Sequence, residues 1–119
     1  MKDQIAKYLS ILKIELLDLE EDISALIALT EERGLRKEIT DYVQMENISL
    51  LSSEFSGIRR VLDSIDSLDT SEYTELQDFV DDLRLKLKDG IDKSGYPNAV
   101  FMFVERKVQK VAGYVISEI

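Results

Sequence analysis

The side chains able to do chemistry in this chain are mainly its carboxylates. Its 119 residues include 24 acidic and 15 basic side chains, and they include neither cysteine nor histidine. Without thiol or imidazole groups, a Ser-His-Asp constellation, a cysteine nucleophile and a thiolate zinc site are all excluded. What remains is chemistry in which carboxylates hold Mg²⁺ or Mn²⁺, or chemistry on lysine and tyrosine.

Acidic side chains recur at helical spacing in two parts of the sequence. The candidate Mg²⁺ ligands are Glu15, Asp18, Glu21, Asp22, Glu75 and Asp78. Steps of three and four residues place side chains on one face of a helix, and most of these acids follow such steps. If the two helices faced each other inside a bundle, their carboxylate oxygens could share a metal ion.

Part of this pattern resembles the all-α nucleoside triphosphate pyrophosphohydrolases, which bind Mg²⁺ through a Glu-Glu-x-x-Glu element and a Glu-x-x-Asp element. Glu75-x-x-Asp78 matches the second element, and Glu20-Glu21 begins the first, but Ser24 stands where the third glutamate belongs. The resemblance implies an alternative function, Mg²⁺-dependent hydrolysis of nucleotides or related phosphates. We favour the simpler interpretation that these acids coat the solvated faces of helices, with no catalytic site and no cofactor.

The clearest element that could position these acids is the first segment. Its apolar residues alternate in steps of four and three: Ile5, Leu9, Leu12, Leu16, Leu19, Ile23 and Leu26. This spacing predicts a helix over about residues 3–33, with Gly34 at its C-terminal end. Further apolar residues widen the stripe, which is typical of a helix that packs in a bundle.

Three more helices are predicted, over about residues 35–68, 71–89 and 98–117. In the first of these the apolar stripe changes phase and serines lower the helix preference, so a bend or a break is expected within 44–57. Residues 99–104 are rich in β-forming side chains and are also compatible with a strand. We favour a helix there because the helical spacing continues beyond them.

The chain is therefore predicted to be one all-α domain over residues 1–119, an antiparallel bundle of four helices, or five if the second breaks. An unbroken second helix would be about 50 Å long, whereas the third would span about 28 Å. This mismatch leaves part of an apolar stripe uncovered. Either the second helix breaks, or a second subunit covers the excess.

The turn at residues 100–104 is apolar on nearly every face, so it is predicted to lie in the core or in an interface. The interface candidates are Phe101, Met102, Phe103, Val104 and Tyr114. Together with the sustained helical stripes, they favour a non-enzymatic interaction module that forms a homodimer. Another protein is the alternative partner.

The net charge of −9 bears on the remaining partners. Binding to phosphates requires a basic surface, so nucleic acid and anionic membrane surfaces are not expected as partners. No secretory signal is recognisable, and no apolar run approaches the ~20 residues of a membrane-spanning helix. We therefore expect a cytoplasmic protein.

Overall fold

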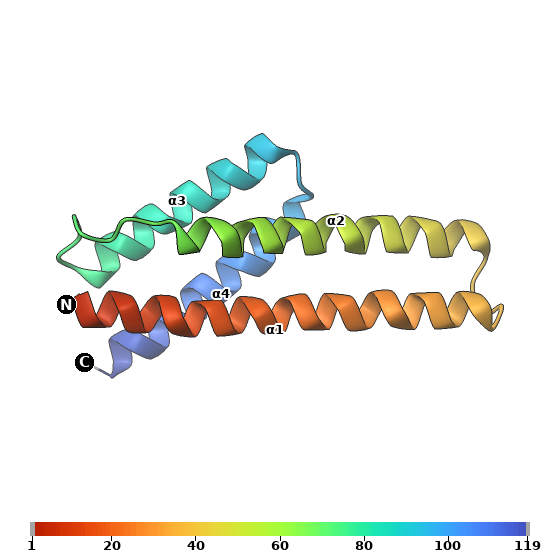
Figure 1. Ribbon diagram of the computed structural model, residues 1–119, viewed down its shortest axis with the longest axis horizontal. Helices are drawn as coiled ribbons and strands as arrows, with labels where there is room; N and C mark the ends of the chain where they lie inside the picture. Colours follow the sequence, from red (N-terminus) through yellow and green to blue (C-terminus); the bar gives the residue numbers. More distant parts are fainter. Residues whose placement is uncertain (1, 119) are drawn as a thin grey trace.

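The computed structural model describes residues 2–118, and within this range it contains four α-helices and no strand (Figure 1). The helices are α1 (Lys2–Leu35), α2 (Asp41–Asp66), α3 (Leu76–Ser94) and α4 (Asn98–Ser117). The predicted all-α fold of four packed helices is confirmed. Residues 99–104 are helical, so the strand alternative is wrong.

The second helix is continuous through 44–57, so of the two alternatives predicted there, a bend or a break, the break does not occur. It begins at Asp41, later than predicted, because Lys37 adopts a left-handed backbone with φ of 63° and the chain reverses there. The Thr40 side chain caps the new start by accepting a hydrogen bond of 3.2 Å from the Val43 amide. Gly34 does not end the first helix, which continues to Leu35.

The third helix is shifted five residues toward the C-terminus at both ends, from 71–89 to Leu76–Ser94. The residues at its predicted start instead form a turn, in which the Asp69 carboxylate accepts hydrogen bonds from the Ser71 amide (2.9 Å) and hydroxyl (2.7 Å). At the other end, Gly95 has φ of 74° and terminates the helix in the left-handed conformation.

The molecule is elongated because α1 and α2 form a long antiparallel hairpin, and α3 and α4 pack against only one half of it (Figure 1). The radius of gyration is 16.7 Å, against about 13.5 Å expected for a compact chain of this length. We call residues 24–53 the arm and the rest of the four helices the base. Every buried residue except Gly34 lies in the base.

The base is held together by a continuous apolar core to which all four helices contribute. Tyr8 is fully buried there, and its hydroxyl donates a hydrogen bond of 3.1 Å to the Val108 carbonyl, which joins α1 to α4. Burial raises the pKa of this tyrosine. Gly57 lets α2 approach α4 closely, since a Cβ at this position would lie 2.9 Å from both methyl groups of Val100.

Candidate functional site: an uncovered face of the arm

Glu15, the first of the six candidate metal ligands, is taken up by contacts within the base. Its Oε1 lies 3.8 Å from the Lys107 ammonium and forms a closer ion pair with Lys110, both on α4. The hydrogen bond from Lys110 is the main reason that the pKa of Glu15 is lowered, and Lys107 adds to it. This carboxylate therefore holds α4 against α1.

The other five acids do not form a metal site. Asp18, Glu21 and Asp22 are exposed on α1, and Glu75 and Asp78 are exposed where α3 begins. Among the residues that the structure describes, no group of three or more acidic side chains is placed to hold a metal ion. The hydrolase alternative thus finds no ligand set in this arrangement.

The five interface candidates on α4 are divided between the core and the surface. Val104 is fully buried inside the chain's own core, so for this residue the core alternative holds and not the interface one. Phe101 and Phe103 are half-buried, and the Arg84 guanidinium lies 5.9 Å from the centre of the Phe101 ring. The apolar turn at 100–104 is therefore explained mostly by packing within the base.

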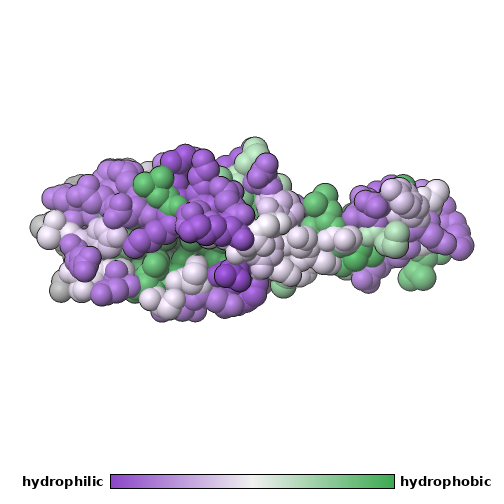
Figure 2. Space-filling model, turned by 90° about the horizontal axis from the view of Figure 1, so that it is seen from above, coloured by the Kyte–Doolittle hydropathy of each residue, from purple (hydrophilic) through white to green (hydrophobic). Residues whose placement is uncertain are grey.

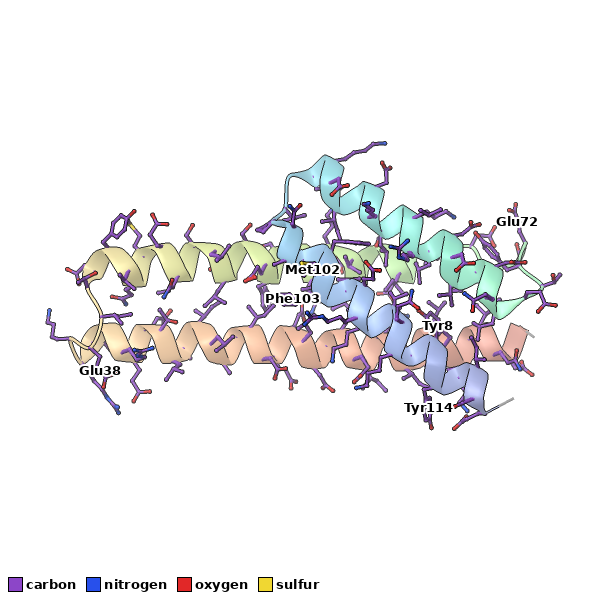
Figure 3. All side chains as sticks on the ribbon, turned by 180° about the vertical axis from the view of Figure 1, so that it is seen from behind. Tyr8, Glu38, Glu72, Met102, Phe103 and Tyr114 are labelled. Atoms are coloured by element: carbon purple, nitrogen blue, oxygen red, sulfur yellow. The ribbon has the colours of Figure 1, made fainter. Side chains whose placement is uncertain are left out.

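Two of the α4 candidates remain at the surface. Met102 is 54% exposed and Tyr114 is 53% exposed. The Tyr114 ring already has a partner in the Lys7 ammonium, which lies 5.9 Å from its centre. Met102 and Tyr114 lie well apart along α4 (Figure 3). They do not make one apolar patch.

Seven of the exposed large apolar side chains lie on the arm. Its exposed apolar side chains are Leu26, Leu29, Leu35, Tyr42, Val43, Met45 and Leu50. Figure 2 shows the arm as a narrow extension of the base with hydrophobic side chains at its surface. Because α3 and α4 stop short of the arm, only the opposite helix of the hairpin covers each of its helices.

A partly buried ion pair lies near the boundary between base and arm. Glu20 is 6% exposed, and its carboxylate accepts two hydrogen bonds from the Arg59 guanidinium, one of them 2.8 Å long from Nε. The contact raises the pKa of Arg59. It ties α1 to α2 a few residues before the arm begins.

On α1, the bare face of the arm continues the face that α4 covers in the base. Glu15 and Tyr8 contact α4. Leu26 and Leu29 follow Glu15 by 11 and 14 residues. Since each residue turns the helix by about 100°, both leucines lie within about 40° of Glu15 around the helix axis. Both leucines are 49% exposed. The stripe is therefore covered by α4 at one end, whereas at the other end its leucines stay about half exposed.

The same continuation holds on α2. Gly57 meets Val100 of α4 in the base. Leu50 and Val43 precede Gly57 by 7 and 14 residues and so lie on about the same face. Leu50 is 52% exposed and Val43 is 39% exposed. On both helices of the hairpin, the apolar face that contacts α4 in the base thus continues into the arm, where α4 no longer contacts it.

The exposed area of the whole chain agrees with this description. Its accessible surface is 7400 Å², whereas a compact monomer of 13.6 kDa exposes about 6600 Å². The difference of about 800 Å² reflects the projecting arm.

Comparison with protein families, with curated proteins and with solved structures finds no significant match. None of the described helices is both long enough and apolar enough to cross a membrane. The arm surface thus has to be interpreted from its own residues. The sequence carries a signal for this surface in a second stripe, Asp22, Leu26, Leu29 and Arg33, at steps of four, three and four.

Proposed function

We propose that this protein is a non-enzymatic helical interaction module that forms a homodimer, and that the arm is its interface. The observation that carries the proposal is the apolar face that α4 covers in the base and leaves bare over the arm. Exposed apolar faces of this extent mark interaction sites in soluble proteins. A second copy would complete on the arm the packing that α4 supplies in the base.

The charge pattern of the arm favours an identical partner. In the stripe on α1, Asp22 lies at one end, Arg33 at the other, and Leu26 and Leu29 between them. A twofold axis between residues 27 and 28 would place Leu26 against the partner's Leu29. The same axis would place Asp22 against the partner's Arg33. Antiparallel pairing thus brings opposite charges together at both ends of an apolar centre, as a self-complementary interface requires.

Both charged groups are accessible for such a contact. Asp22 is exposed, and the structure gives it no ion pair among residues 3–118. Arg33 is half-exposed and its Nε lies 3.4 Å from Glu38 at the tip of the same arm. A single exposed ion pair of this kind contributes little, so the arginine is free to exchange partners.

The test is to reverse the charges one at a time and then together. Light scattering or sedimentation should give twice the chain mass of 13.6 kDa for the wild type. Asp22→Lys and Arg33→Glu each set like charges against each other at two places in the dimer. We expect each to raise the dissociation constant about tenfold or more, which corresponds to about 1.4 kcal/mol. Mixing the two variants should restore a dimer that contains one chain of each.

Glu31→Lys is the matched control for Asp22→Lys. It makes the same change of charge at an exposed residue on the arm, but nine residues away and so on the opposite side of α1. It should leave the dimer intact. A strictly monomeric wild type at tens of micromolar would refute the homodimer. A dimer that neither charge reversal weakens would refute the antiparallel pairing of the arms. The protein would then form a dimer through another surface.

A further inference from the structure

A cavity of about 220 Å³ lies in the base between α2 and α3. It exists because α3 packs against α4 and α1 and diverges from α2 along its length (Figure 1). The walls are apolar and include Val61 and Leu68 on one side and Leu83, Leu87 and Ile91 on the other. No residue of the arm lines this cavity, so its binding can be tested separately from the proposed dimer.

Two cationic side chains, one from each wall, border this apolar space. Arg60 belongs to α2 and Lys86 to α3, and both are exposed. Within residues 3–118 neither forms an ion pair, although acids outnumber bases in the chain. The Lys86 ammonium donates a hydrogen bond of 3.5 Å to the Tyr73 hydroxyl, which in turn donates to Asp82 (2.9 Å), and it lies 6.0 Å from the centre of the Tyr73 ring. The residues that line the cavity thus include two cations and no carboxylate.

Gly90 is a second, independent feature of the cavity. It lines the space from within α3, where glycine weakens a helix relative to alanine. A Cβ at this position would meet nothing within 4 Å, so no contact inside the protein requires a glycine here. The missing side chain keeps that part of the cavity open.

We propose that this cavity binds a medium-chain fatty-acid anion. The apolar walls would take the hydrocarbon chain, and Arg60 and Lys86 would bind the carboxylate at the border. An engineered cavity of about 150 Å³ holds the six carbons of benzene. By that proportion, 220 Å³ accommodates about nine carbons.

The test is a series of straight-chain carboxylates from hexanoate to dodecanoate, titrated calorimetrically below their micelle concentrations. Each added methylene should tighten binding about fourfold while it still enters the cavity. The gain should stop near nine or ten carbons. Nonanol, which has the chain but no charge, should bind more weakly than nonanoate.

Variants then locate the site. Gly90→Leu fills the cavity and should weaken nonanoate binding at least tenfold. Gly113→Leu is its matched control, because Gly113 also lies exposed inside a helix with open space around it but does not line the cavity. Arg60→Glu changes an exposed side chain with no ion pair, so the fold should persist while nonanoate binding falls about tenfold.

The proposal is overturned if nonanoate does not bind at millimolar concentration. It is equally overturned if affinity keeps rising with chain length and neither Gly90→Leu nor Arg60→Glu reduces it, since that describes adsorption to exposed apolar surface.

Discussion

Gly57 offers the sharpest test of how the base is packed. It lies inside α2, where replacing glycine by alanine normally stabilises a helix by about 1 kcal/mol. At this position, however, the added methyl group would lie 2.9 Å from both Val100 methyl groups and 3.3 Å from the Tyr96 ring. Val100 is fully buried and β-branched, so it has little freedom to move away.

The magnitude follows from these two opposing terms. Overfilling a packed core costs about 1–3 kcal/mol. After the gain in helix preference of about 1 kcal/mol, we expect Gly57→Ala to destabilise the protein by up to about 2 kcal/mol. Gly90 and Gly113 have nothing within 4 Å of an added Cβ. Alanine at either position should therefore gain only the higher helix preference and stabilise the protein by about 0.5–1 kcal/mol.

The assay is urea unfolding followed by circular dichroism, with all variants at one protein concentration because dimerisation would shift the midpoints. The two control glycines report the helix preference directly, and the difference between them and Gly57 reports the steric contact between α2 and α4. If Gly57→Ala stabilises the protein as much as Gly90→Ala and Gly113→Ala do, the close approach of these helices is refuted.

Three further outcomes are expected. Burial raises the pKa of Glu54, so its charged form lowers the stability of the fold at pH 7, and this loss disappears as the pH falls through the raised pKa. Glu54→Gln should therefore raise the urea midpoint at pH 7 but not below about pH 4. Equal midpoints of variant and wild type at pH 7 would contradict this. Tyr8→Phe removes the hydrogen bond to the Val108 carbonyl and should cost about 1 kcal/mol of unfolding free energy, whereas an unchanged value would show that the bond contributes nothing. In hydrogen exchange of the Asp22→Lys variant, amides of the arm should exchange faster than those of the base, because the arm has few buried contacts; uniform protection would argue against this difference.

The sequence predicted the fold class and most helix boundaries because the apolar stripes recur every three or four residues along nearly the whole chain. The errors lie where single residues decide the backbone. Lys37 reverses the chain by adopting positive φ, a conformation rare outside glycine and asparagine, and nothing in its neighbours announces it. Asp69 and Ser71 fit a helix cap and a tight turn equally well, and the turn formed.

The candidate surface was only half predictable. The lengths of the helical stripes correctly indicated that some apolar face would remain uncovered if the second helix did not break. The position of the uncovered face depends on where α3 and α4 pack against the hairpin. The spacing of apolar residues within one helix does not indicate which other helix will cover them. Met102 and Leu26 are both apolar and helical, and only the arrangement of the four helices shows which belongs to the larger uncovered surface.

Both ends of the described chain lie at the base, on the side away from the tip of the arm (Figure 1). Near them, Lys7 pairs with Glu118. If two arms overlap antiparallel about residues 27 and 28, the two bases point in opposite directions. At 1.5 Å per residue, residue 3 of one chain is then about 75 Å from residue 3 of the other. Such an assembly is a spacer: it holds two bases, two sets of chain ends and two cavities at opposite ends of a rod.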